Sequence, residues 1–163
     1  MPCLRFGVTH TEVIPVGRKE AREIALHLIF ELSFKQFSDD DLLTDRLERS
    51  VMDSLAGDIA LYAGELEEKQ KKYIRDTVLG VCAHYADLDA IVASYSTNWS
   101  INRMSHMTIS LLRLALYEMK YAEEISVGTA IDEAVELAKK YESKEAASFI
   151  NGVLGGVARE KAE

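Results

Sequence analysis

The sequence that decides the fold is ISLLRLALYEM at Ile109–Met119, followed after a short gap by AIDEAVELAK at Ala130–Lys139. Alanine, leucine and glutamate, which all favour helices, recur in both runs. Apolar residues return every three or four positions, and this spacing places them on one face of a helix. Because alanine lets helix backbones approach closely, the two runs predict a tight helical bundle.

Apolar periodicity extends outward from these runs over most of the chain, which predicts an all-α fold. Only two prolines occur, and both precede the first periodic segment. The secondary structure of the segment 51–64 is left undecided, because two glycines interrupt its apolar pattern. The expected helices run over about 17–32, 38–52, 65–85, 88–95, 101–121, 127–141 and 144–159.

Two breaks in the pattern suggest the domain organisation. Residues 1–16 show no sustained period and predict a flexible N-terminal arm. The run SYSTNWS at Ser94–Ser100, polar and small except for Trp99, is the best candidate for a boundary between subdomains. We therefore expect an N-terminal helical subdomain over 17–97 and a C-terminal helical subdomain over 98–163.

Composition limits the class of function. The chain has 163 residues, 48% of them hydrophobic and 28% charged, which is typical of a globular protein. It has no apolar run long enough to span a membrane and no apolar signal core, so we expect a cytoplasmic protein without membrane contact. A net charge of -8 argues against general binding to nucleic acid. Any RNA contact must then use a local basic patch.

The sequence shows no arrangement that demands catalysis, and we expect no enzyme activity, cofactor or metal. The histidines and cysteines stand apart and match no ligand spacing. Asp132 and Glu136 share a helix face, which could serve acid–base chemistry. Lys139 and Lys140 follow at spacings that pair with these acids, so a solvated helix surface is the better interpretation.

Two groups of residues favour binding to RNA. Arg18, Lys19 and Arg22 gather at the start of a helix, where positive charge and free backbone N–H groups receive phosphate. Phe149 lies at the margin of the apolar stripe of the last helix, with Lys144 nearby. An aromatic ring there could stack on a base, and a ring that covers the end of the bundle is an equally good interpretation.

Five blocks, read in order, resemble the NusB family of bacterial transcription antitermination factors. The resemblance extends from Arg18 to Ala158. The blocks are KEAREIALHLIFEL at 19–32, YIRDTVLGV at 73–81, NWSINRMSHMTISLLRLALYEM at 98–119, AIDEAVELAKKY at 130–141 and SFINGVLGGVA at 148–158. Several ordered blocks are more specific than any single helical pattern.

The resemblance implies two small helical bundles packed together at right angles. It also implies a non-enzymatic RNA-binding adaptor. With NusE, a small-subunit ribosomal protein, such an adaptor binds single-stranded boxA RNA in nascent ribosomal RNA transcripts. Through this complex it acts indirectly on the RNA polymerase elongation complex.

Site residues follow from the same resemblance, position by position. The basic start of the first helix corresponds to Arg18, Lys19 and Arg22. Glu145 is the acidic position that borders the RNA surface, and the aromatic RNA contact is Phe149, with Lys144 beside it. The aromatic residue that touches NusE corresponds to Phe30. The family pattern predicts that the basic start of the first helix and the segment 144–149 face one another.

Of the positions that depart from the family pattern, two concern RNA binding, and two alternative functions stay open. Glu20 stands where the family has arginine, and Ser148 where it often has lysine. One alternative is a self-associating homodimer that masks its RNA face. The other is a module in ribosomal RNA modification or maturation, related to the N-terminal domain of cytosine methyltransferases. The sequence has no Rossmann-type glycine motif, so we expect no methyl transfer by this chain alone.

Overall fold

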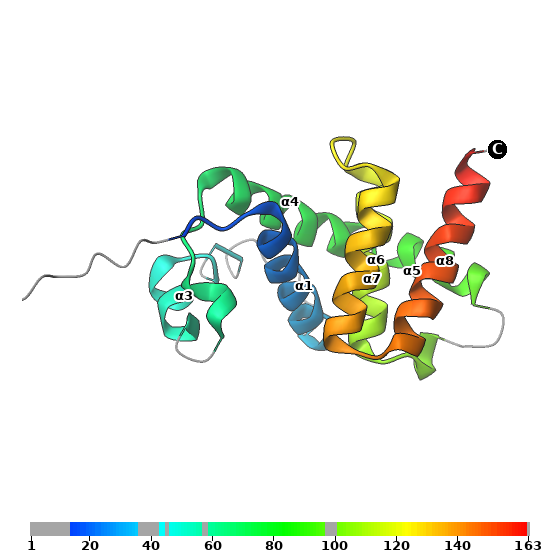
Figure 1. Ribbon diagram of the computed structural model, residues 1–163, viewed down its shortest axis with the longest axis horizontal. Helices are drawn as coiled ribbons and strands as arrows, with labels where there is room; N and C mark the ends of the chain where they lie inside the picture. Colours follow the sequence, from blue (N-terminus) through cyan, green and yellow to red (C-terminus); the bar gives the residue numbers. More distant parts are fainter. Residues whose placement is uncertain (1–13, 36–42, 45, 57–58, 97–100, 163) are drawn as a thin grey trace, which may run out of the picture.

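The computed structural model describes residues 14–35, 43–44, 46–56, 59–96 and 101–162, and within these ranges it contains helices and no strand (Figure 1). This confirms the predicted all-α class. The longer helices are α1 (Arg18–Lys35), α3 (Arg49–Ala56), α4 (Glu68–Ala83), α5 (Tyr85–Tyr95), α6 (His106–Tyr121), α7 (Val127–Tyr141) and α8 (Lys144–Ala162). Two short 3-10 helices, η1 (Ala60–Ala63) and η2 (Ile101–Arg103), precede α4 and α6.

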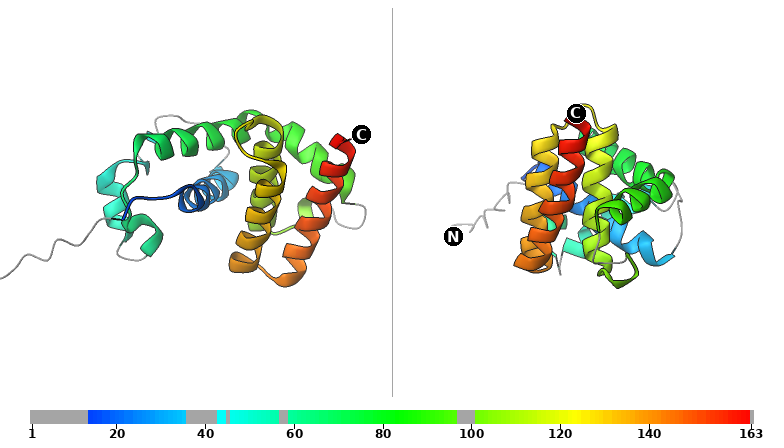
Figure 2. Two further views of the ribbon diagram at one scale, coloured as in Figure 1. Left: turned by 45° about the horizontal axis from the view of Figure 1, so that its top comes forward. Right: turned by 90° about the vertical axis from the view of Figure 1, so that its right-hand side faces the viewer.

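The helices form two bundles that share α6 as a common support. One bundle holds α1, α3, η1 and α4, and the other holds α5 to α8. Helix α6 packs against α1 and α4 on one side and against α5, α7 and α8 on the other. Helix α4 runs crosswise to α6, α7 and α8 (Figure 2). The expected pair of packed bundles is therefore confirmed.

A close approach of α4 to α6 depends on Gly80. A Cβ atom added at Gly80 would lie only 2.2–2.3 Å from ring carbons of Tyr117 on α6 and 2.5 Å from its hydroxyl oxygen. The absence of a side chain lets the tyrosine ring lie directly on the α4 backbone.

Serine side chains cap the first turns of α6, α7 and α8 in the C-terminal bundle. The Oγ atoms of Ser105 and Ser126 accept hydrogen bonds from the backbone N–H groups of Thr108 and Thr129, at 3.0 and 3.1 Å. Ser143 Oγ caps α8 in the same way. Each cap satisfies an N–H group that the helix itself cannot pair. The Ser105 cap also explains why the expected helix over 101–121 is divided into η2 and α6.

Two further expectations about helix boundaries need correction. The chain turns at Leu47 and Glu48, so the expected helix to residue 52 is interrupted and α3 begins at Arg49. Helix α4 ends at Ala83 and not at residue 85 as expected, and Tyr85 begins α5 with 44% of its surface exposed. Residues 38–41 and the predicted boundary between 97 and 98 lie outside the described residues.

The predicted flexible arm is wrong for its last residues. Val16 N–H donates a 2.9 Å hydrogen bond to the carbonyl of Glu65, and Glu65 N–H donates to the carbonyl of Ile14. Val16 is buried in the core. The segment 14–16 is thereby fixed beside the residues that precede α4, and residues 1–13 lie outside the described ranges.

Candidate functional site

Arg22, predicted to contact RNA, lies inside the protein. Its Nε donates to both carboxylate oxygens of Glu118 on α6, at 2.9 and 3.1 Å, and Glu133 lies 3.8 Å from Nη1. Only 3% of Arg22 is exposed. Tyr73 of α4 also donates its hydroxyl to Glu118, and burial together with that carboxylate raises the pKa of Tyr73. Arg22 is thus part of a buried ion pair and is not available to phosphate, so its predicted role needs correction.

The other two basic residues at the start of α1 have different environments. The guanidinium of Arg18 lies 4.0 Å from the centre of the Tyr73 ring, a cation–π contact that leaves Arg18 half-buried. Lys19 is exposed. Because residues four apart share a helix face, Arg18 and Arg22 both turn toward α4, and Lys19 points outward.

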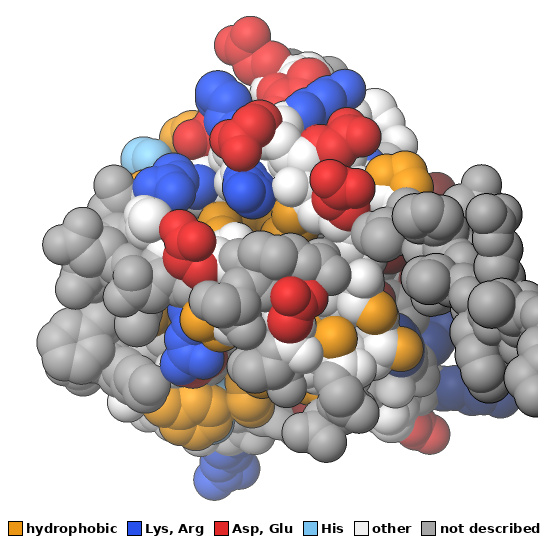
Figure 3. Space-filling view, turned by 90° about the vertical axis from the view of Figure 1, so that its left-hand side faces the viewer, with side chains coloured by type: hydrophobic (Ala, Val, Ile, Leu, Met, Phe, Trp, Pro, Cys, Tyr) orange, Lys and Arg blue, Asp and Glu red, His pale blue; other side chains and the backbone are white. Residues whose placement is uncertain are grey.

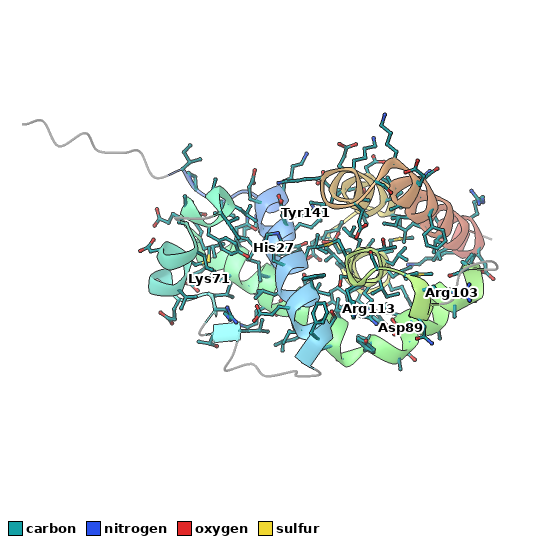
Figure 4. All side chains as sticks on the ribbon, turned by 90° about the horizontal axis from the view of Figure 1, so that it is seen from below. His27, Lys71, Asp89, Arg103, Arg113 and Tyr141 are labelled. Atoms are coloured by element: carbon teal, nitrogen blue, oxygen red, sulfur yellow. The ribbon has the colours of Figure 1, made fainter. Side chains whose placement is uncertain are left out.

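A chain of hydrogen bonds connects α1 with the end of α7. Glu23 forms a 2.5 Å ion pair with Lys140 and accepts a second hydrogen bond from the hydroxyl of Tyr141. His27 lies between two tyrosine hydroxyls, 2.7 Å from that of Tyr141 and 2.9 Å from that of Tyr62 on η1. Figure 4 shows His27 and Tyr141 pointing toward one another. The start of α1 and the end of α7 therefore share one surface.

Burial and hydrogen bonding set the charge of this group. Although partial burial opposes the change, hydrogen bonds from Lys140 and Tyr141 lower the pKa of Glu23, so its carboxylate stays charged. Burial lowers the pKa of His27, despite the opposing charge of Glu23. Lys140 keeps 59% of its side chain exposed, and it pairs with Glu23 of α1 instead of the acids on its own helix that the sequence suggested. Helix periodicity does not reveal a pair that spans more than a hundred residues.

The start of α8 holds the remaining predicted RNA contacts. Lys144 and Glu145 are exposed, and Phe149 is half-buried. Lys144 borders a groove of about 670 Å³ between α7 and α8, together with Lys139 and Ser148. Glu145 and Phe149 instead line a separate hollow on the other side of the α8 start. The structure thus divides these residues between two hollows.

The second hollow contains a residue that the sequence analysis did not single out. Arg103 of η2 is exposed and lines the same hollow as Glu145 and Phe149. Figure 4 places Arg103 near α8 at the periphery of the molecule. The sequence could have pointed to Arg103, because this residue ends the block NWSINR, which is part of the family resemblance.

Aromatic side chains cover the other end of α1. Phe30, the predicted partner contact, is half-buried, and its ring lies edge-on to Phe34 with centroids 5.1 Å apart. Phe34 is 57% exposed and stacks on His106 of α6 at 4.2 Å. Phe34 therefore presents more apolar surface than Phe30 and was missed by the sequence analysis.

Two other kinds of site are not found in the described part of the chain. In the described ranges, no cluster of histidine, cysteine, aspartate or glutamate could hold a metal ion. No helix in that part of the chain is both long and apolar enough to cross a membrane. At the α3 end of the molecule, basic and acidic side chains are interspersed (Figure 3).

Comparisons with known proteins agree on one family. The sequence profile of the NusB family matches residues 19–159. The transcription antitermination protein NusB of Acetivibrio thermocellus is 36% identical over 146 residues, which are 90% of this chain and 91% of that protein. The NusB protein of Listeria monocytogenes is 34% identical, and the match covers 88% of this chain and 97% of the relative.

Solved structures extend the agreement to the fold. NusB from T. maritima superimposes with a TM-score of 0.74 at 26% identity, over 90% of this chain and 94% of that chain. A chain from the crystal structure of antitermination factors NusB and NusE in complex with dsRNA gives a TM-score of 0.68 at 22% identity, over 88% and 96%. The protein therefore belongs to the NusB family of transcription antitermination factors.

Proposed function

We propose that this protein is a non-enzymatic adaptor that binds boxA-type RNA in nascent ribosomal RNA transcripts together with a NusE-type ribosomal protein. One observation carries the proposal. The Glu23–Lys140 ion pair brings the start of α1 to the end of α7, immediately before α8. The exposed cations of Lys19, Lys140 and Lys144 can then act on one RNA strand.

The overall charge explains why this surface should be local and weak by itself. A protein of net charge -8 repels a polyanion, so a few exposed lysines must supply the phosphate contacts. Each phosphate contact releases counterions and makes binding depend on salt. A partner that adds contacts to the same RNA would raise the affinity, and the solved complex of a NusB with NusE and RNA supports such an arrangement.

We assign the NusE-type partner to the aromatic cluster formed by Phe30, Phe34 and His106. These rings lie at the end of α1 and the start of α6, away from Arg18 and Lys19 at the beginning of α1. An exposed aromatic side chain of this kind is a common anchor of protein interfaces. RNA and partner would then occupy different surfaces and bind together.

The RNA surface is tested by titrating a boxA-type RNA against the wild type and a Lys140→Ala/Lys144→Ala double variant, with and without the NusE-type partner. We expect the partner to tighten wild-type binding and the double variant to lower the affinity in both conditions. Lys72→Ala is the matched control, because Lys72 is an exposed lysine on α4, paired with Asp76. Absence of RNA binding in every condition, or equal loss in the control, would contradict the proposal.

The partner surface is tested by Phe34→Ala in a pull-down with the NusE-type protein. We expect weaker partner binding and unchanged binding of RNA to the variant alone. Tyr85→Ala, which removes another exposed aromatic ring from α5, should leave partner binding unchanged. Light scattering at several protein concentrations separates this proposal from the homodimer alternative, in which added RNA would dissociate a dimer.

A further inference from the structure

A group of aromatic side chains lies where the end of α4 meets the end of α6. The ring of His84, at the junction of α4 and α5, stacks on the ring of Tyr121, with centroids 4.1 Å apart and an angle of 14° between the planes. Tyr117, one turn earlier on α6, lies 5.5 Å from Tyr121. His84 thus supports one face of the Tyr121 ring, and 37% of Tyr121 remains exposed.

Carboxylates border these rings. Burial raises the pKa of Tyr117, and the negative charges of Asp76 and Glu124 add to the shift, so both carboxylates lie close to that ring. Asp76 is paired with Lys72 at 2.5 Å. Glu124 is exposed and forms no ion pair with another residue that the structure describes. We call the three rings together with the Glu124 carboxylate the Tyr121 surface.

The neighbouring Tyr85 shows which group such an arrangement holds. The guanidinium of Arg113 lies 3.8 Å from the centre of the Tyr85 ring and donates two hydrogen bonds to the carboxylate of Asp89, at 2.8 and 2.9 Å (Figure 4). A guanidinium that lies on a ring and pairs with a carboxylate satisfies both its face and its N–H groups. Within the described ranges, the Tyr121 surface offers a ring and a carboxylate but has no arginine on the ring.

Lys120 lies near the Tyr121 ring but does not fill this place. Its Nζ atom is 5.5 Å from the ring centre, close to the limit of about 6 Å for a cation–π contact. Lys120 is exposed and forms no ion pair with another described residue. A guanidinium stacks on aromatic rings and is less strongly hydrated than an ammonium group, so an incoming arginine displaces Lys120 at little cost.

We propose that the Tyr121 surface binds an arginine side chain from a basic segment of a protein partner. The guanidinium lies on the exposed part of the Tyr121 ring and donates hydrogen bonds to the Glu124 carboxylate. Charge complementarity favours this occupant over RNA, because the carboxylates and the net charge of -8 attract a basic segment and repel phosphate.

The Tyr121 surface is separate from the two surfaces assigned to RNA and to the NusE-type protein. Tyr121 ends α6, and His106, part of the aromatic cluster assigned to the NusE-type partner, begins it. The helix has 16 residues and is about 24 Å long. Lys140 and Lys144 lie beyond the far end of α7, whose first turn follows Tyr121 in the chain. The basic segment can therefore bind while RNA and the NusE-type protein are bound.

The test titrates a fluorescently labelled peptide of alternating glycine and arginine against the full-length protein and measures anisotropy. A peptide of alternating glycine and lysine, with the same charge, should bind more weakly, because an ammonium group does not stack on the ring. Tyr121→Leu removes the ring and keeps an apolar side chain, so it should weaken the arginine peptide by about 2- to 30-fold, the range for one cation–π contact. Tyr121→Phe should bind like the wild type. Equal affinity of the wild type and Tyr121→Leu would overturn the inference.

Matched variants separate the Tyr121 surface from general attraction to an acidic protein. Glu124→Gln should weaken the arginine peptide by up to about 5-fold, as expected for an exposed ion pair. Glu48→Gln changes the net charge equally at an exposed turn before α3 and should leave the affinity nearly unchanged. Tyr85→Ala should also leave it unchanged, because Arg113 already covers that ring. A loss in Glu48→Gln as large as in Glu124→Gln would overturn the inference.

Removal of the competing cation should have the opposite effect. Lys120→Met should raise the affinity for the arginine peptide, because the incoming guanidinium no longer displaces an ammonium group from the Tyr121 ring. A lower affinity in Lys120→Met would contradict the placement of the guanidinium on that ring.

RNA and the NusE-type protein are the other possible occupants. We expect Tyr121→Leu to bind boxA-type RNA and the NusE-type protein with wild-type affinity, each measured in the absence of the peptide. A loss of either interaction would assign the Tyr121 surface to that ligand and overturn the inference. Unchanged binding of both, together with weaker binding of the arginine peptide, would support a separate basic partner.

Discussion

The start of α1 and the start of α8 both looked like basic RNA contacts, but the structure uses them differently. At the start of α1, Arg22 is turned into the core and pairs with Glu118, and Arg18 lies on the Tyr73 ring. At the start of α8, Lys144 and Glu145 both stay exposed. Positive charge serves stability in one region and is available to a ligand in the other.

The difference follows from what each helix packs against. Helix α1 packs against both α4 and α6, so two of its faces are covered and polar residues on them must find partners inside. The first turn of α8 lies at the edge of its bundle, beside α7 and η2, where water reaches the charged groups. The number of cations in a helix sequence does not show which of them are buried in ion pairs and which are exposed to a ligand.

The largest predicted effect comes from removing the buried cation. Arg22→Ala removes the cation that pairs with the buried carboxylate of Glu118 and leaves that carboxylate only the hydroxyl of Tyr73, which should lower the free energy of unfolding by about 3–5 kcal/mol. Denaturant titration measures this loss. Lys19→Ala, three residues earlier and exposed, should change stability by less than about 0.5 kcal/mol. If Arg22→Ala weakened RNA binding and left stability unchanged, the assignment of Arg22 to the core instead of the RNA surface would be wrong.

A charge reversal at the start of α8 should lower RNA affinity and leave stability nearly unchanged, the opposite of the effect of Arg22→Ala. Lys144→Glu should lower RNA affinity by about tenfold or more and reduce the salt dependence of binding, because one phosphate contact is lost and a repulsion is added. Thermal unfolding should be nearly unchanged, since Lys144 is exposed. Fluorescence anisotropy at several salt concentrations measures the first effect. A large loss of stability with unaltered RNA binding would reverse the assignment.

The junction between the two regions should respond to pH through His27. Because burial lowers the pKa of His27 in the folded protein, the unfolded chain binds more protons as the pH falls below the ordinary value of 6.5. Stability is therefore complete above that pH and declines below it, with a slope of at most about 1.4 kcal/mol per pH unit for one proton. Denaturant titrations from pH 7.5 to 5 measure the slope.

A matched pair of variants isolates this effect. His27→Gln should flatten the slope between pH 6.5 and 5, whereas His84→Gln, whose ring stacks on Tyr121 away from this hydrogen-bonded chain, should retain it. Loss of the slope in His84→Gln alone would show that the polar chain through His27 does not carry the pH dependence.

The smallest predicted effect concerns a surface ion pair. Lys139 lies 3.0 Å from Glu136 one turn earlier on α7, and both side chains are more than half exposed. Lys139→Ala should change the free energy of unfolding by less than about 0.5 kcal/mol. A loss comparable to that of Arg22→Ala would remove the distinction between buried and exposed charge.

Much of the fold could be predicted from periodicity, since α7 runs over Val127–Tyr141 as expected and the C-terminal bundle packs through its alanines. Boundaries set by local hydrogen bonds could not. The break before α6 depends on the Ser105 side chain, and the docking of Val16 depends on Glu65, forty-nine positions away in the chain. Neither contact produces a periodic pattern of apolar residues, so neither can be predicted from the sequence.

The candidate site was harder to predict for a related reason. The sequence predicted surface positions for the candidate RNA contacts. In the structure Lys19, Lys144 and Glu145 are exposed, and Phe149 is half-buried. We expected the starts of α1 and α8 to face one another. The contact that the structure shows is between Glu23 on α1 and Lys140 at the end of α7, just before α8. The later part of α1 contacts His106 of α6 through Ser33. Long-range pairs such as Arg22–Glu118 are set by helix packing, which one sequence does not display.

The central claim is that the exposed lysines at the start of α1, the end of α7 and the start of α8, and not the arginines at the start of α1, contact RNA. The salt dependence of boxA-type RNA binding tests it most directly. In a Lys19→Ala/Lys140→Ala/Lys144→Ala variant, bound to the NusE-type partner, the slope of log affinity against log salt should fall by about 2 to 3 relative to wild type. An unchanged slope in a stably folded triple variant would contradict the account.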